Sequence, residues 1–187
     1  MQAKKTNFRS FLTSANLQVL AGKNSEQNEQ VVKEAKKGEL ILHTSASGSP
    51  FCVIKAKNEK ADAVSIKEAA IFCAAFSKAF KQGHKSIEVH TFKKDDVYKT
   101  KKMPQGTFGV KRILKKLSVK PELALGLKSK ELQCSPSNSL DKILLPLRYS
   151  DLPKEKASEL IKKALEKKGI KTSPEDIIQL IPLGFAP

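Results

Sequence analysis

The segment 65–82 constrains the fold most, because it is apolar around most of a helical circumference. Its apolar side chains recur at helical spacing and also fill the other directions around the axis (Ile66, Ala69, Ala70, Ile71, Phe72, Cys73, Ala75, Phe76 and Phe80). Ser65 and Glu68 match a capping box at its start, and Gly83 is a typical residue after a helix end. A helix without a polar face has to be buried. We therefore predict one long central helix that the rest of the chain covers.

Short β-prone runs separated by turn residues lie on both sides of this helix. A hairpin is predicted where residues 14–16 separate the first two runs, and a helix capped by Asn24 or Ser25 follows, up to Gly38. The alternation predicts an α+β fold in which a mixed, mostly antiparallel sheet packs on the long Ala/Phe-rich helix. The β-prone runs are residues 8–13, 17–21, 39–43, 51–55, 86–91, 96–99, 108–113 and 117–119.

The positive charge is concentrated in the first part of the chain. The formal net charge is +16, of which residues 1–135 carry +14 and residues 136–187 carry +2. A segment rich in serine and proline, residues 134–139, lies at the change. We predict a basic domain over residues 1–135 and a small, mainly helical C-terminal extension over residues 136–187.

Two helices are predicted in this extension, over residues 153–168 and 175–180. The first carries one apolar stripe that has to be covered, either by the chain's own fold or by a protein partner. Both explanations are open from the sequence. The stripe consists of Ala157, Leu160, Ile161, Ala164 and Leu165.

The basic surface indicates an anionic partner, either a nucleic acid or an anionic membrane. The lysines do not follow an amphipathic helix, which disfavours the membrane. No apolar run approaches the roughly 18 residues of a spanning helix, and no secretory signal is found, so we expect a cytoplasmic location. Three cysteines, far apart, indicate free thiols in a reducing compartment. Cys52 and Cys73 are expected in the core and Cys134 at the surface.

No arrangement of residues predicts catalysis. None of the histidines, His43, His84 and His90, lies at metal-ligand spacing from another histidine or a cysteine. The chain has no phosphate-binding glycine loop, no dinucleotide fingerprint and no nucleophile elbow. We therefore expect a protein that is not an enzyme, with no catalytic residue, metal or cofactor.

Residues 93–120 carry the strongest local signal, with ten basic residues against two acidic ones. Tyr98 and Phe108 are interleaved with the charges, and a basic turn containing proline and glycine spans residues 101–106. On a strand pair with a turn, lysines can follow a phosphate backbone while rings stack on bases. A solvated lysine-rich surface is the alternative explanation. The RNA contacts predicted here are Lys93, Lys94, Tyr98, Lys99, Lys101, Lys102, Lys111 and Arg112.

The order of motifs over residues 8–120 resembles the NFACT RNA-binding domain. Two short strands lead into a glycine–basic–asparagine step at residues 22–24 and a helix with Asn28 one turn on. Gly48 and Ser49, followed by an apolar strand, match the next part of the pattern. An Ala-rich helix that ends in serine and a late basic Pro/Gly hairpin complete it.

The signature motif of that family, Asp-x-Trp-x-His, is altered in this chain. Glu39 stands at the aspartate position and Ile41 at the tryptophan position, whereas His43 is retained. A hydrogen-bonding role is therefore the one that the resemblance carries over to His43. Together with the resemblance, the polar loop of residues 44–49 gives six candidate RNA-binding residues: Lys23, Asn24, Asn28, His43, Gly48 and Ser49. Of these, Lys23, Asn24, His43 and Gly48 are expected to converge on one surface.

The resemblance implies RNA binding linked to translation, with tRNA or ribosome-bound RNA as the partner in ribosome-associated quality control. Some bacterial members accompany tRNA thiolation enzymes. An accessory subunit that presents tRNA to an RNA-modification enzyme is therefore the alternative. The coiled coil and the glycosylase-like domain of large family members are not found, so we expect a stand-alone module of the bacterial type.

Overall fold

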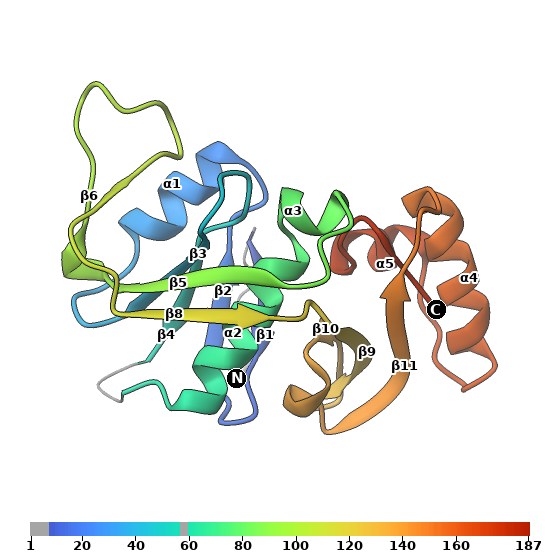
Figure 1. The fold of residues 1–187 in the computed structure, drawn as a ribbon. Helices are drawn as coiled ribbons and strands as arrows, with labels where there is room; N and C mark the ends of the chain where they lie inside the picture. The colour runs from blue at the N-terminus through green and yellow to red at the C-terminus, as the bar shows by residue number, and fades with distance from the viewer. Residues whose placement is uncertain (1–7, 57–59) are drawn as a thin grey trace.

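The computed structural model describes residues 8–56 and 60–187. Its largest sheet has six strands in the order β1-β2-β4-β3-β5-β8, and every neighbouring pair is antiparallel (Figure 1). The predicted α+β class with a mostly antiparallel sheet is confirmed, as is the hairpin of β1 and β2. The strands are β1 (Arg9–Leu12), β2 (Gln18–Ala21), β3 (Leu40–Thr44), β4 (Cys52–Lys55), β5 (Ile87–Lys93) and β8 (Lys115–Val119).

A helix covers each face of this sheet. Successive side chains of a strand point to opposite faces, and both faces carry apolar side chains that need to be buried. In β2, Val19 and Ala21 belong to the core formed with α2 (Ala63–Ala75), whereas Leu20 belongs to the core formed with α1 (Ser25–Lys33). The predicted cap of α1 is present, since the Asn24 side chain accepts a hydrogen bond from the third residue of the helix. The first sheet is therefore a closed layer between α1 and α2.

The central helix is shorter than predicted. A separate helix, α3 (Lys78–Lys81), follows α2, because the Ser77 hydroxyl accepts a hydrogen bond from the Phe80 N–H (3.2 Å) and caps a new helix. At the other end, the cap is Asp62 rather than Ser65; the Asp62 carboxylate accepts from the Ser65 N–H (2.9 Å). The prediction of one helix over residues 65–82 was wrong at both ends.

A second antiparallel sheet, in the order β10-β9-β11-β12, carries helices α4 (Lys154–Glu166) and α5 (Pro174–Leu180). We call residues 123–187 the C-terminal unit. The expected boundary at residue 135 falls inside this sheet, and residues 136–187 contribute strands as well as helices. How the chain divides into domains stays a prediction. The strands are β9 (Leu123–Lys128), β10 (Glu131–Ser135), β11 (Lys142–Tyr149) and β12 (Phe185–Ala186), with a 3-10 turn η2 (Ser137–Ser139) between β10 and β11.

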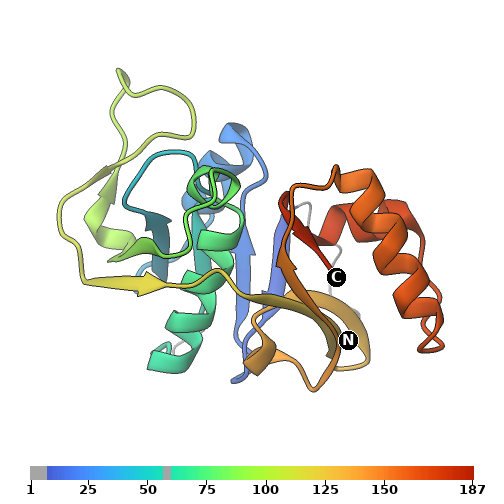
Figure 2. The same ribbon diagram turned by 45° about the vertical axis from the view of Figure 1, so that its right-hand side comes forward.

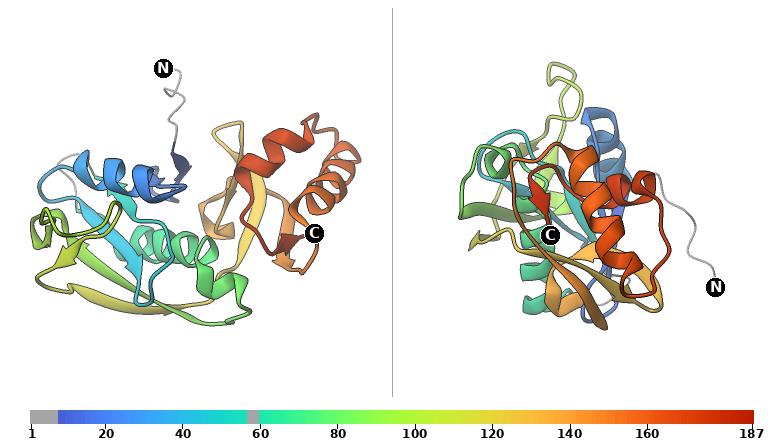
Figure 3. Two further views of the ribbon diagram at one scale, coloured as in Figure 1. Left: turned by 90° about the horizontal axis from the view of Figure 1, so that it is seen from above. Right: turned by 90° about the vertical axis from the view of Figure 1, so that its right-hand side faces the viewer.

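The C-terminal unit lies at one end of the first sheet, beside β1 (Figures 2 and 3). The side-chain amide of Gln133 accepts a hydrogen bond from the Leu12 N–H (2.9 Å) and donates one to the Leu12 carbonyl (3.2 Å). Phe11 and Leu125 belong to one continuous core. Cys134 is buried in it, so the expectation of an exposed thiol was wrong, because this position of β10 faces inward.

Most of the apolar stripe of α4 is covered by the chain itself. Ala157, Ile161 and Leu165 are buried in the core shared with Ile177 of α5, whereas Leu160 is 46% exposed. The amphipathic helix therefore serves its own fold.

The basic stretch forms a small hairpin of its own. After a 3-10 turn, η1 (Lys94–Asp96), strand β6 (Val97–Tyr98) pairs with β7 (Gly109–Val110). The loop between them, residues 99–108, rises beside α1 (Figure 1). Over residues 8–56 and 60–187, no helix has the length and hydropathy to cross a membrane.

Candidate nucleic-acid interface

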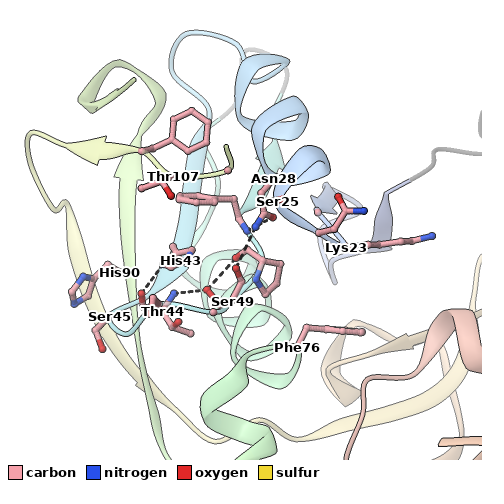
Figure 4. A pocket seen from close by; sticks show the side chains of 18 of the residues that line it. Lys23, Ser25, Asn28, His43, Thr44, Ser45, Ser49, Phe76, His90 and Thr107 are labelled. Carbon is pink, nitrogen blue, oxygen red and sulfur yellow. Dashed lines mark hydrogen bonds between the residues drawn. The ribbon is translucent and has the colours of Figure 1, made fainter. Parts of the chain in front are cut away.

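A cavity of about 600 Å³ opens between α1, the loop after β3 and residues 105–108 (Figure 4). Pockets of roughly 300–1,000 Å³ typically take small organic groups, so a single nucleotide fits this volume. The residues expected to converge, Lys23, Asn24, His43 and Gly48, all line it. Asn28 and Ser49 line it as well.

Asn28 and Ser49 build the cavity rather than offer free polar groups. The Asn28 side chain accepts a hydrogen bond from the Phe51 N–H (3.0 Å) and donates a long one to the Ser49 carbonyl (3.5 Å). A Cβ at Gly22 would lie 2.3 Å from the Asn28 oxygen, so only glycine lets the helix approach this closely. The Ser49 hydroxyl is buried and accepts from the Thr44 N–H (3.1 Å).

The loop of residues 44–49 is docked on helix α3. The Lys78 N–H donates to the Gly48 carbonyl (2.7 Å). Gly48 has a φ of +95°, and a Cβ there would lie 2.9 Å from the Lys78 Cβ. Position 48 therefore requires glycine, both for its positive φ and for the close approach to Lys78. Without a side chain, the backbone of Gly48 itself lines the cavity.

His43 begins a row of aromatic rings along the cavity. Its ring lies 4.4 Å from the Phe51 ring, which meets the edge of Phe108 at 5.3 Å. The Lys99 ammonium lies over the Phe108 ring at 5.2 Å. Phe108, the ring interleaved with the charges of the basic stretch, thus reaches the cavity. Its partly exposed ring offers a stacking surface for a base, whereas Phe51 is buried behind it.

The protonation of His43 is fixed by its surroundings. Burial lowers the pKa of His43 below its ordinary value, hydrogen bonding to Thr44 and Ser49 opposes this, and nearby His90 adds to it. His43 is therefore neutral at pH 7. Its Nδ1 lies 2.7 Å from the Thr44 carbonyl oxygen, which can only accept, so Nδ1 carries the proton. The remaining nitrogen, Nε2, is a hydrogen-bond acceptor.

The loop of residues 99–108 is held to α1 by the carboxylate of Glu29. This carboxylate pairs with Lys99 and Lys33 and accepts a hydrogen bond from the Gly106 N–H (3.0 Å). These donors lower the pKa of Glu29 to about 2, with Lys99 the largest cause. A Cβ at Gly106 would lie 2.6 Å from the Ser25 carbonyl oxygen, so the loop touches the start of α1.

The predicted contacts of the basic stretch do not line the cavity. Lys94 donates to the Val32 carbonyl (2.8 Å), Arg112 pairs with Asp96 (3.4 Å), and the ring of Tyr98 packs on Gly109. Lys99 is bound to Glu29. Lys93, Lys101, Lys102 and Lys111 are exposed and make none of these contacts, and Tyr98 and Arg112 are exposed as well.

Sequence reasoning missed several cavity residues. Arg9 and Lys81 line it, although they lie far from the basic stretch in sequence. Nothing in the sequence placed Arg9 at this cavity, because it gets there through the packing of β1. Nothing in the sequence marked Lys81, since its position depends on the break before α3. Residues 8–56 and 60–187 contain no cluster of three or more metal-ligating side chains.

This fold and cavity define a basic α+β domain with a nucleotide-sized site. The family model described as the NFACT protein RNA binding domain matches residues 7–112, and the chain belongs to this family. The match ends before β8, so the C-terminal unit lies outside it.

Two similar proteins extend the comparison. The chain is 27% identical over 179 residues to the archaeal Rqc2 homolog aRqcH of Methanocaldococcus jannaschii, covering 89% of this chain and 26% of the relative. This chain therefore spans about a quarter of that protein's length. The solved C-terminal structure of the fibronectin/fibrinogen-binding protein from Streptococcus suis has a TM-score of 0.56 at 25% identity, covering 70% of this chain and 49% of that one.

Proposed function

We propose that this protein binds RNA through the cavity and the basic hairpin beside it, in a process linked to translation. Membership of the NFACT RNA-binding domain family supports RNA as the ligand. Similarity to an Rqc2 homolog supports a role in ribosome-associated quality control, with tRNA as the RNA that is bound. Such a role implies a cytoplasmic location.

The observation that carries the proposal is the acceptor nitrogen of His43. A neutral imidazole with a bare Nε2 does not attract a phosphate but accepts a hydrogen bond from a hydroxyl or amino group. The ribose 2′-hydroxyl is such a donor, and DNA lacks it. The partly buried ring of Phe108 nearby provides a stacking surface, while Lys23 at the border provides charge.

The test compares RNA, its 2′-O-methyl form and DNA of one sequence, all single-stranded, in filter-binding assays. One hydrogen bond contributes about 1 kcal/mol, so RNA should bind roughly five-fold more tightly than the other two. His43→Ala should remove this preference and leave the melting temperature nearly unchanged. His84→Ala is the matched control, because His84 is exposed and does not line the cavity.

Two results would contradict the proposal. If the wild-type protein binds no RNA at low salt, RNA binding itself is wrong. If His43→Ala keeps the preference for RNA, or lowers the melting temperature while each folded molecule binds normally, His43 is a structural residue.

A further inference from the structure

A second cavity, of about 640 Å³, adjoins the first one, because Arg9 and Lys23 line both. One of its walls comes from the start of β1 and from Lys23. The other wall comes from β10, from α5 and from the segment before α5. The family match over residues 7–112 includes the first wall but not the second. The volume of this cavity, like that of the first, fits a single nucleotide.

Arg9 is a half-buried cation that is held in place without a carboxylate. Its guanidinium donates to the Gly22 carbonyl (2.8 Å) and lies 4.7 Å from the centre of the Phe76 ring. No ion pair among residues 8–56 and 60–187 involves it. A guanidinium has five N–H donors, so donors remain for a group that accepts two hydrogen bonds at once, such as a phosphate.

Lys23 lies next to this guanidinium, because it follows the residue whose carbonyl Arg9 binds. Its N–H donates to the side chain of Gln27 (3.1 Å), and its own side chain is exposed. In Figure 4 that side chain extends from the first cavity toward the side where the ribbon of the C-terminal unit enters the view. The ion pairs of the described residues do not include Lys23 either. Two cations without an acidic partner in this part of the chain therefore mark the border between the cavities.

The wall from the C-terminal unit offers the groups that a nucleotide needs. Lys171 is exposed and, within the described residues, has no ion-pair partner. Thr172 and Gln179 provide donors and acceptors of the kind that bind the edge of an unstacked base. Half-buried Ile170 and Leu180 provide an apolar surface against which the face of a base can pack.

The cavity also lies beside an open strand edge, which suits an extended peptide. The N–H and carbonyl of Leu12 in edge strand β1 point away from β2, to the side chain of Gln133. The main-chain groups of Ser10, two residues earlier, point to the same side, and Ser10 lines the cavity. Charge distinguishes the two ligands. Three cations line this cavity against one acidic side chain among the described residues, Asp176, which favours a polyanion. The border shared with the first cavity favours RNA over an acidic peptide.

We propose that the second cavity binds the nucleotide next to the one in the first cavity, on a single-stranded segment of RNA. Arg9 and Lys23 bind the phosphate that joins the two nucleotides, and Lys171 binds the phosphate on the other side of the second one. The inference rests on the proposed function. It assigns a nucleotide contact to the C-terminal unit, which lies outside the family match.

The first test compares two small ligands by NMR titration of the ¹⁵N-labelled protein. The dinucleotide UpU and uridine 3′-methylphosphate carry the same singly charged phosphodiester, but only UpU has a second nucleoside. UpU should bind about five-fold more tightly, because its second base gains contacts in the second cavity. It should also shift the amides of Gly48, Thr172 and Gln179 with one midpoint. Equal affinity of the two ligands, or a UpU shift confined to Gly48, would overturn the inference.

The second test measures the affinity of a single-stranded RNA of eight nucleotides across a salt series. Lys171→Gln should weaken binding about three-fold at 0.1 M salt and reduce the slope of log affinity against log salt by about 0.7. Lys168→Gln is the matched control, because Lys168 is exposed nearby and lines neither cavity. It should change neither value, and both variants should keep the wild-type melting temperature. Equal affinities of the two variants would contradict the phosphate contact of Lys171.

The outcomes separate this inference from the proposed function. If the protein prefers RNA in a His43-dependent way but binds UpU and the methyl ester equally, the second cavity takes no nucleotide and RNA binding stands. If no RNA binds at low salt, the proposed function fails first. If inorganic phosphate shifts the Thr172 and Gln179 amides as far as UpU does, the cavity is a small-anion site. Shifts of these amides with hexaglutamate but not with UpU would identify a peptide site and overturn the assignment to RNA.

Discussion

The two loops that border the first cavity are held by different kinds of interaction. Residues 44–49 are fixed by uncharged hydrogen bonds, from the Thr44 N–H to the Ser49 hydroxyl and from the Lys78 N–H to the Gly48 carbonyl. Residues 99–108 are fixed by the carboxylate of Glu29. The first loop is continuous with the core, whereas the second is attached to the surface of α1.

This difference predicts how each loop contributes to folding and to RNA binding. Buried uncharged hydrogen bonds are costly to leave unmade, so the first loop should be as stable as the core. The second loop, by contrast, is attached through one partly buried carboxylate on the surface of α1, so it can come away without opening the core, and its attachment depends on pH and salt. We therefore expect changes in the first loop to affect folding and binding together, and changes in the second to affect binding alone.

The largest effect is expected for Asn28→Ala, which removes the acceptor of the Phe51 N–H behind the first loop. A buried N–H without a partner costs roughly 1–3 kcal/mol, or roughly 2–4 °C per kcal/mol in a chain of this size. Thermal unfolding should show this loss, and RNA affinity should fall with it. Gln27→Ala is the control, because its side chain bonds only to the exposed Lys23 N–H (3.1 Å). Equal melting temperatures for the two variants would contradict the distinction between the loops.

A smaller effect is expected for Gly106→Ala in the second loop. The new Cβ meets the Ser25 backbone, and Gly106 has a φ of +74°, so the loop has to move away from α1. RNA affinity should fall about three-fold with little change in melting temperature. Gly38→Ala introduces the same kind of strain, at a φ of +86°, where its Cβ meets nothing. If both variants bind RNA equally, contact between this loop and α1 does not matter for the site.

Acid should release the second loop before the first. The pKa of Glu29 is lowered from its ordinary value to about 2, so its contribution is complete above pH 4.5 and is lost as pH falls through 2. The NMR shift of the Gly106 amide should follow this change, whereas the Lys78 amide, bonded to Gly48, should not. His43 also titrates at acid pH, so Glu29→Gln is needed to assign the step. A Gly106 step that persists in this variant would exclude Glu29 as its source.

The sequence predicted the parts of this fold that depend on local chemistry. The β1–β2 hairpin and the Asn24 cap follow from turn and capping preferences, and both are present. The pattern of apolar residues did not show the break before α3, because Ser77 also fits a helix interior when its bond to the Phe80 N–H is unknown, whereas the family resemblance did imply that the Ala-rich helix ends in this serine. The second sheet was missed for two reasons. The turn of the β9–β10 hairpin is Ser129-Lys130, which lacks the glycine or asparagine typical of such turns, and β9 pairs with β11 across β10 and η2, which leaves no local signal.

The candidate site was predicted only in part, because the sequence indicates turns and strand ends but not tertiary contacts. Lys23, Asn24, His43 and Gly48 lie near turns and strand ends, where the sequence indicates exposed polar groups, and they do converge. Charge counting, by contrast, does not show which lysines have partners. It gave Lys94 and Lys99 the same weight as Lys101, although the first two are bonded to Val32 and Glu29. Arg9 and Lys81 reach the cavity through tertiary packing alone.

The smallest effect is expected for Lys101→Gln, at the far side of the second loop. Lys101 is exposed and does not line the cavity, so it cannot reach a base that is bound there. We therefore expect its contact with RNA to be to a backbone phosphate. A single lysine–phosphate contact carries no sequence information, so RNA and DNA of one sequence should both weaken about two-fold at moderate salt. The melting temperature should not change. His43→Ala should act on RNA alone, and a Lys101→Gln effect confined to RNA would show that this loop also reads the sugar or base.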